Sequence, residues 1–172
     1  MTEISTPLGP MLAGATSKGI CVLEFNNRIR LDKELTDLQQ LLNAVIIPGR
    51  NHFSDQVETE LREYFEGKRK TFSVPLHIPG NEFSQSVWKT LQEIPYGETW
   101  SYKQQAEVMN NPKAIRAIAT TNGRNRLAII IPCHRVIGSN GTMTGYAGGI
   151  EKKKWLLKFE SSNSEIPAGR LF

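Results

Sequence analysis

The chain has 172 residues, 39% of them hydrophobic and 22% charged, which is typical of a soluble globular protein with one domain or two small ones. It contains no run of about eighteen apolar residues and no basic-then-apolar leader, so neither a membrane span nor a secretory signal is predicted. Cys21 and Cys133 are too few for a disulfide framework and lack Cys-x-x-Cys spacing. We therefore expect an intracellular, reduced protein without a metal site.

The positive charge of the chain is concentrated in its second half. The formal net charge is +4, but residues 1–80 hold nine basic and ten acidic side chains. Residues 99–158 hold ten basic and only two acidic ones. A solvated basic face and a surface for a polyanion such as DNA fit this distribution equally well, so charge alone does not decide between them.

The first quarter of the chain has the pattern of an antiparallel strand pair. Apolar residues within 12–15 precede a Ser-Lys-Gly turn, and the β-rich run 20–25 follows it. Cys21 lies in that second run, where a free cysteine behaves as a small buried hydrophobe. We expect Cys21 to be structural.

Two helices and a linker follow. Leucine spacing predicts a helix over 34–43, and a second helix is expected over 54–65 with Ser54 as its N-cap. Residues 75–80 contain two prolines and a glycine, which indicates a stiff linker. Nothing in residues 1–70 assembles a catalytic constellation.

Beyond residue 80 the pattern changes to short helices. The spacing predicts helices over 81–93, 99–109 and 112–121, the last with Pro112 at its first position. A tight Asn-Asn-Pro turn joins the second and third helices, which makes a helix-turn-helix candidate. Many helix pairs of this kind bind nothing, so the pattern alone is a weak signal.

The helix over 112–121 has two different faces. We expect Ile115 and Ile118 to pack inward, and the opposite face to be cationic but otherwise small. The residues of that small face are Lys113, Arg116, Ala117 and Thr120. Small side chains permit close approach to a nucleic-acid groove, and Arg116 could reach into it.

A candidate nucleophile follows an apolar run. Residues 129–131 are three isoleucines, predicted to form a buried strand that Pro132 ends. Cys133, His134 and Arg135 come directly afterwards, which places a thiol, an imidazole and a cation at the edge of the core. Taken alone, a Cys-His pair is more often structural. Zinc binding is disfavoured because no second ligand pair has finger-like spacing.

Residues 131–136 (IPCHRV) resemble the PCHRV signature of the O6-alkylguanine-DNA alkyltransferases, and the likeness extends in order and spacing over most of the second half. The stretches that carry it are 83–102, 111–119, 122–125 and 145–160. The resemblance implies an α/β N-terminal domain over 1–78, with a small antiparallel sheet plus helices. It also implies a mostly α, helix-turn-helix (winged-helix-like) DNA-binding and catalytic domain over 79–160, followed by a tail over 161–172.

The resemblance also implies the chemistry, which is direct reversal of DNA damage without a cofactor. The alkyl group of O6-alkylguanine, and also of O4-alkylthymine, would pass irreversibly and stoichiometrically to Cys133. His134 would take the thiol proton through a bound water, and Glu160 would orient the imidazole. Asn125 would brace the turn at the active site. Tyr102 would crowd the phosphate of the target nucleotide and give a proton to the departing guanine.

The implied partner is duplex DNA, bound in the minor groove without sequence preference by a monomeric protein in the cytoplasm, or in the nucleus of a eukaryote. Arg116 would fill the space of the extruded base, beside the small residues Ala117 and Thr120. Three cations would contact phosphates: Lys113, Arg124 and Arg135. Five residues would form the base pocket: Trp88, Val136, Tyr146, Ala147 and Gly148.

One position departs from the family pattern, and three other functions compete. Arg126 stands where the family usually has proline, which affects the turn that holds Asn125. In the alkyltransferase-like lesion binders tryptophan typically replaces the acceptor cysteine, so Cys133 argues against that function. A regulator that senses alkylation would need a separate sequence-specific domain, for which 172 residues leave no room. A cysteine hydrolase would need a separate His and Asn or Asp set, which is not evident.

Overall fold

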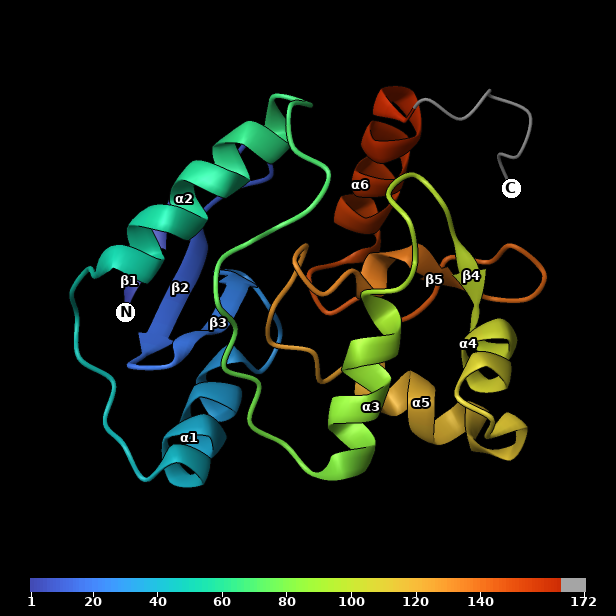
Figure 1. Ribbon diagram of the computed structural model, residues 1–172, viewed down its shortest axis with the longest axis horizontal. Coiled ribbons are helices and arrows are strands. Elements are labelled where there is room, and N and C mark those ends of the chain that lie inside the picture. The colour runs from blue at the N-terminus through green and yellow to red at the C-terminus, as the bar shows by residue number, and fades with distance from the viewer. Residues whose placement is uncertain (165–172) are drawn as a thin grey trace. The chain divides into compact units, whose positions relative to one another are not determined.

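The computed structural model describes residues 1–164 and divides into two units, residues 1–80 and 81–172 (Figure 1). The N-terminal unit is built on an antiparallel sheet of order β1-β2-β3. Its strands are β1 (Thr2–Ile4), β2 (Met11–Thr16) and β3 (Gly19–Phe25). The predicted hairpin is confirmed, with Met11 opposite Phe25 and a register shift between Gly14 and Ala15. Every residue of β3 is buried, Cys21 included.

Two helices complete the sheet's core, α1 (Leu31–Leu42) and α2 (His52–Phe65). Leu38 of α1 packs in a cluster with Cys21 and Val22. Asn51 is the N-cap of α2, because its side chain accepts from the backbone N–H of Ser54 and the Ser54 hydroxyl accepts from the Asn51 N–H in return. The expectation that Ser54 itself is the cap was therefore wrong by three residues, since Ser54 is the third residue of α2 and the second partner of the capping box.

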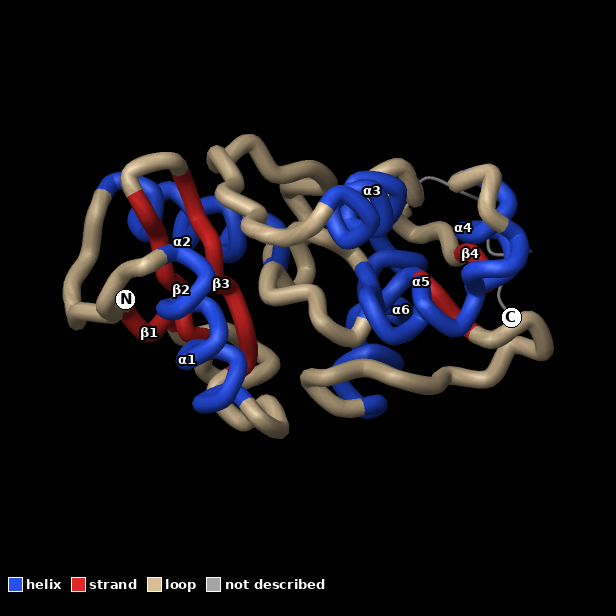
Figure 2. Tube along the Cα trace, turned by 90° about the horizontal axis from the view of Figure 1, so that it is seen from below, coloured by secondary structure: helices blue, strands red, loops and turns tan. Residues whose placement is uncertain are grey.

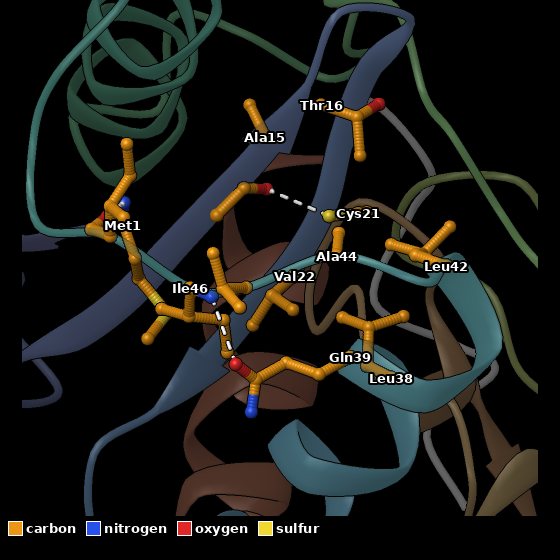
Figure 3. A pocket seen from close by; sticks show the side chains of 13 residues that line it. Met1, Ala15, Thr16, Cys21, Val22, Leu38, Gln39, Leu42, Ala44 and Ile46 are labelled. Atoms are coloured by element: carbon orange, nitrogen blue, oxygen red, sulfur yellow. Dashed lines mark hydrogen bonds between the residues drawn. The ribbon is translucent and has the colours of Figure 1, made fainter.

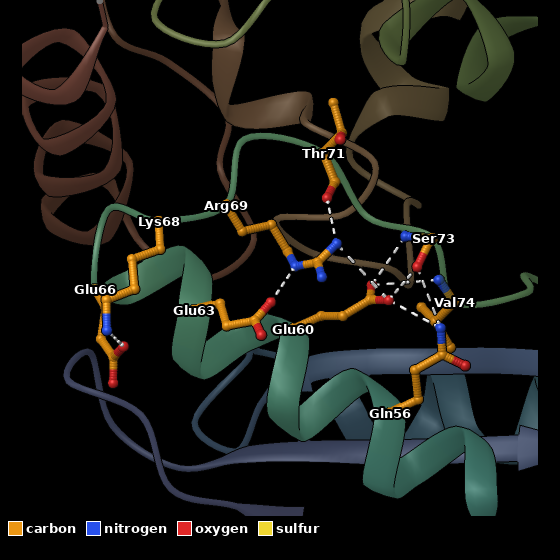
Figure 4. A network of polar contacts seen from close by, with 9 residues as sticks. All are labelled: Gln56, Glu60, Glu63, Glu66, Lys68, Arg69, Thr71, Ser73 and Val74. Atoms are coloured by element: carbon orange, nitrogen blue, oxygen red, sulfur yellow. Dashed lines mark hydrogen bonds and ion pairs between the residues drawn. The ribbon is translucent and has the colours of Figure 1, made fainter.

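A buried carboxylate fastens the segment after α2 to that helix (Figure 4). Glu60 accepts from the backbone N–H of Ser73 at 2.9 Å and of Val74 at 3.2 Å, and from the Gln56 amide at 2.9 Å. Burial alone would raise the pKa of Glu60, but these hydrogen bonds lower it below the ordinary value. These bonds hold residues 73 and 74 against α2, directly before the chain pairs with β3.

The segment that follows pairs with the start of β3. Ile20 donates its N–H to Pro75 O at 2.9 Å, and His77 donates to Ile20 O at 2.8 Å. Gly19 has a φ of 142°, and a Cβ at this position would lie 2.3 Å from Pro75 O. Only glycine permits this close backbone approach.

The C-terminal unit is mainly helical, as Figure 2 shows. Its elements are α3 (Glu82–Leu91), β4 (Trp100–Ser101), α4 (Tyr102–Val108), the 3-10 turn η1 (Pro112–Ala114), α5 (Ile115–Asn122), the 3-10 turn η2 (Cys133–Arg135), β5 (Val136–Ile137) and α6 (Ile150–Asn163). Strands β4 and β5 form a short parallel pair. No helix in the described part of the chain is long and apolar enough to span a membrane.

The predicted helix-turn-helix pair is α4 and α5. Ser101 caps α4 as expected, but the helix starts later than predicted because residues 100–101 pair with β5. The buried side chains of Gln105 and Asn122 join the two helices by reciprocal amide hydrogen bonds of 3.2 and 2.7 Å. These bonds fix the angle between the helices, since each amide would otherwise be buried without a partner.

The three isoleucines at 129–131 are buried but form turns, so the predicted strand there was wrong. Ile129 has a φ of 72°, which is incompatible with a strand. The physical reason is the Asn125 side chain, which accepts from Leu127 N–H at 2.9 Å and donates to Ile131 O at 2.8 Å. Because the amide takes these backbone groups, they do not enter a sheet ladder.

Candidate active site

Cys133 begins the turn η2, immediately after the buried isoleucine segment. It is partly exposed, whereas His134 next to it is completely buried. The Asn125 amide donates to Cys133 Sγ at 3.3 Å. Asn125 therefore contacts both the backbone of the turn and the sulfur atom, which is the bracing position predicted for it.

The imidazole of His134 is oriented by Glu160 from α6. His134 Nε2 and Glu160 Oε1 lie 2.8 Å apart, and neither side chain has any exposed surface. Burial holds the pKa of His134 below its ordinary value, although Glu160 acts in the opposite direction. The ring is therefore neutral at pH 7, with its proton on Nε2 toward the carboxylate. Nδ1 is then a proton acceptor, and it has no hydrogen-bond partner within residues 1–164.

Glu160 is also paired with Arg135, which corrects one prediction. Arg135 Nε donates to Glu160 Oε2 at 2.8 Å, and Nη1 donates to Ile94 O at 2.7 Å. Burial alone would raise the pKa of Glu160, but His134 and Arg135 hold it far below its ordinary value. Arg135 is 7% exposed, so its guanidinium is not available to a phosphate and we remove it from the predicted DNA contacts.

Lys153 is a functional candidate that the sequence reasoning missed. Its side chain is fully buried, and Nζ donates to Val136 O at 2.6 Å and to Thr144 O at 3.0 Å. Burial lowers the pKa of Lys153 to about 8, partly offset by attraction to Cys133. The sequence did contain a signal, because Lys153 precedes Leu156, Leu157 and Glu160 at helical spacing and so shares their buried face.

Tyr102 is the first residue of α4, and its hydroxyl reaches the same carbonyl. Tyr102 Oη donates to Thr144 O at 3.4 Å. Burial raises the pKa of Tyr102, and the interaction with Cys133 acts in the same direction. The phenol therefore stays protonated at neutral pH, within electrostatic range of the candidate nucleophile.

The segment from Thr144 to Gly149 forms a wall beside these groups. The Tyr146 ring is 6.4 Å from that of His134 in an edge-on arrangement, and Tyr146 is 9% exposed. Ala147 is partly exposed and Gly148 is buried. The structure thus brings the predicted wall residues to the candidate site.

Two other residues predicted for the base pocket belong to the core instead. The Val136 side chain is fully buried, and Trp88 is 5% exposed, with its indole N–H donating to Thr121 O at 3.1 Å. Side chains closed to solvent in this way do not line an open pocket. We correct both assignments: Val136 gives its carbonyl to Lys153, and Trp88 is tied to the backbone of α5.

The predicted DNA-facing residues are exposed, namely Lys113, Arg116, Ala117, Thr120 and Arg124. No acidic side chain in residues 1–164 forms an ion pair with any of the three cations among them. Ile118 is buried as expected, but Ile115 is 36% exposed, so its predicted inward packing was wrong. Ile115 opens α5 directly after the 3-10 turn, in which no residue is buried.

The second cysteine lies in a different environment, in the N-terminal unit (Figure 3). Cys21 lines a mainly apolar cavity of about 110 Å³, and its thiol donates to Gly14 O at 3.5 Å. Among residues 1–164, no cationic or imidazole side chain lines this cavity. In the described residues, no group of three or more His, Cys, Asp and Glu side chains could hold a metal ion.

Comparison with known proteins decides the family. The model of the 6-O-methylguanine DNA methyltransferase DNA binding domain matches residues 82–162, and that of the ribonuclease-like domain of the same family matches residues 1–78. The chain belongs to the 6-O-methylguanine DNA methyltransferase family. A methylated-DNA–protein-cysteine methyltransferase of Methanosarcina mazei is 44% identical over 160 residues, covering 93% of this chain and 96% of the relative.

Solved structures of the 6-O-methylguanine DNA methyltransferase family confirm the predicted fold class. The Mycobacterium tuberculosis O6-methylguanine methyltransferase matches with a TM-score of 0.80 and 36% identity, covering 97% of this chain and 94% of the other. A structure of the M. tuberculosis protein in complex with DNA matches with a TM-score of 0.78 and 35% identity, covering 95% and 93%. The activity of the chain is therefore that of a methylated-DNA–protein-cysteine methyltransferase in DNA repair.

Proposed function

We propose that this methyltransferase reverses O6-alkylguanine damage in duplex DNA by moving the alkyl group onto Sγ of Cys133. The observation that carries the proposal is the buried pair of His134 and Glu160, which leaves an unpartnered basic nitrogen one residue from a partly exposed thiol. Such an arrangement activates a cysteine, since only the thiolate is a strong nucleophile.

The proton of Cys133 passes through a bound water to His134 Nδ1. Glu160 stabilises the imidazolium that forms, because its carboxylate stays ionised at neutral pH. Two groups favour the thiolate: the Asn125 amide, which donates to Sγ, and the nearby cation of Lys153.

The thiolate attacks the alkyl carbon, so that an S–C bond forms while the bond from that carbon to O6 breaks. The electron pair of the broken bond stays on the guanine, which must gain a proton to leave as a neutral base. Tyr102 supplies that proton. His134 then releases the proton it took from Cys133 to solvent, and Tyr102 takes up a proton from solvent in return. The raised pKa of Tyr102 keeps its proton available until the base departs.

The target base has to leave the duplex before the sulfur can reach it, since the reacting atom lies within the base stack. Arg116, exposed on a face of small residues, fills the space left by the base. Lys113 and Arg124 contact phosphates, which bind DNA independently of sequence. Ala117 and Thr120 suit shallow docking in the minor groove. The DNA complex of the M. tuberculosis relative supports DNA as the partner.

The proposed reaction is single-turnover and extends to O4-alkylthymine. A thioether on Cys133 is not displaced by water at neutral pH, and the groups described around it move protons only. The protein acts as a monomer, since one chain supplies every proposed catalytic side chain, in the cytoplasm or, in a eukaryote, the nucleus.

Peptide mass mapping after reaction with duplex DNA containing O6-methylguanine tests the proposal. The added methyl group should be found on the peptide that contains Cys133. Cys21→Ala should react like the wild type, because Cys21 lies in the core of the N-terminal unit. Methylation of Cys21, or full transfer by Cys133→Ala, would contradict the proposal.

A further inference from the structure

Two consecutive lysines of α6 contact the wall segment, residues 144–149, near its two ends. Lys153 donates to the carbonyl of Thr144, and Lys152 donates to the carbonyl of Gly148. Tyr146 and Ala147 lie between these two attachment points. The position of the wall therefore depends on both contacts.

The Thr144 end is firmly fixed. Lys153 is fully buried and holds Val136 O at 2.6 Å as well as Thr144 O at 3.0 Å. Tyr102 donates to the same Thr144 carbonyl at 3.4 Å. Releasing this end would leave a buried ammonium group short of an acceptor, which is strongly unfavourable.

The Gly148 end is held more loosely. Lys152 is only partly buried, and its Nζ lies 3.3 Å from Gly148 O, a long hydrogen bond. A cation in the first turn of a helix is also opposed by the positive end of the helix dipole, which disfavours the position of Lys152 in α6. Replacing the ammonium group by a water molecule at Gly148 O therefore costs little free energy.

Glycines flank the part of the wall that can move. Gly145 has a φ of 66° and Gly149 a φ of 97°, both in the left-handed region that glycine adopts freely. A Cβ at Gly149 would meet no atom within 4 Å. The backbone can therefore turn at both glycines while Thr144 stays in place.

We propose that Lys152 is a specificity-determining residue, which acts as a latch on Gly148 and limits the size of the alkyl group that the site admits. With the latch closed, Tyr146 stays against His134 and the space beside Cys133 suits a small group such as methyl. With the latch open, the wall moves outward and a bulky group such as benzyl fits. This inference rests on the proposed function, in which residues 144–149 face the alkylated base.

The test compares transfer rates for two free bases, O6-methylguanine and O6-benzylguanine, in the wild type and in Lys152→Met. Free bases need no extrusion, so DNA binding does not enter the result. The benzyl-to-methyl rate ratio should rise about fivefold in Lys152→Met, the factor that one lost hydrogen bond is worth. Lys152→Arg keeps a donor for Gly148 O and should retain the wild-type ratio.

Lys154→Met is the matched control. Lys154 lies in the same turn and carries the same charge, but its ammonium pairs with Glu151 at 2.9 Å instead of the wall. Its ratio should equal that of the wild type. Amide hydrogen exchange gives a second readout, and the amides of Ala147 and Gly148 should exchange faster in Lys152→Met than in Lys154→Met.

The outcomes separate the latch from the reaction itself. If the wild type transfers both groups to Cys133 but the ratio is the same in all variants, the latch is wrong and the proposed function stands. An equal rise in Lys154→Met would also overturn the latch, because it would show an effect of charge alone. If the wild type transfers neither group, the proposed function is wrong, and the proposed role of Lys152, which rests on it, is wrong as well.

Discussion

His134 Nε2 lies 2.8 Å from Glu160 Oε1, and neither side chain has any exposed surface. A carboxylate in this position determines which ring nitrogen carries the proton, and so leaves Nδ1 as the base. The activity of Cys133 is therefore expected to depend on Glu160 of α6, which acts through the imidazole of His134.

Replacing Glu160 with glutamine should separate this dependence from simple folding. Glu160→Gln removes the charge that stabilises the imidazolium, and transfer from free O6-benzylguanine should slow by about 10²-fold, the scale of general-base catalysis. It also leaves the buried guanidinium of Arg135 without its anion, which costs roughly 3–5 kcal/mol. Rates should be measured on the folded fraction, established by thermal unfolding.

Glu151→Gln is the control for Glu160→Gln, because Glu151 is an exposed carboxylate on the same helix. It should match the wild type in rate and in melting temperature. An unchanged transfer rate in folded Glu160→Gln would show that His134 needs no carboxylate partner.

Acidification should destabilise the fold through His134. Its pKa is lowered by burial from the ordinary 6.5, so the unfolded chain binds this proton more readily than the folded one. The contribution of neutral His134 to the free energy of unfolding is fully present above pH 6.5, and it is lost as the pH falls through the lower pKa of the folded protein. Urea unfolding should show that the free energy of unfolding declines between pH 8 and pH 5, and that this decline is shallower in His134→Gln. Equal declines in the two proteins would mean that other groups cause it.

Arg116 should matter for extrusion of the base more than for chemistry. Arg116→Ala should slow transfer from duplex DNA at least tenfold, the effect of losing one charged contact, and leave transfer from free O6-benzylguanine unchanged. Lys113→Ala provides the comparison, since loss of a phosphate contact weakens DNA binding and reduces the salt slope by about 1. Equal slowing of Arg116→Ala on both substrates would instead place this residue in the chemistry.

The parts of the fold that local rules control could be predicted from the sequence. Ser101 caps α4, and the hairpin of β2 and β3 forms around Gly19 as its pattern indicates. The three isoleucines at 129–131 show where such rules fail. Their propensity favours a strand, but a single side chain, Asn125, satisfies the backbone groups that would have formed the ladder.

The sequence predicted which residues form the candidate site better than it predicted which of them pair with one another. Cys133, His134 and Glu160 come together in the structure, but Arg135 was predicted to contact a phosphate of the DNA. Its actual partner is 25 residues away, a pairing that local sequence does not reveal. Lys153 was missed for a related reason, since its charge within a run of lysines concealed the helical position that buries it.

The most direct test of the account is a titration of a known amount of protein with excess O6-methylguanine duplex, followed by intact mass. Transfer should stop at one methyl group per active molecule, because the thioether on Cys133 has no route back to a thiol. The plateau should not change with more DNA or longer incubation. Methyl transfer that continues at a steady rate beyond one equivalent would contradict the account, since Cys133 would then be a recycled catalyst and not the final acceptor.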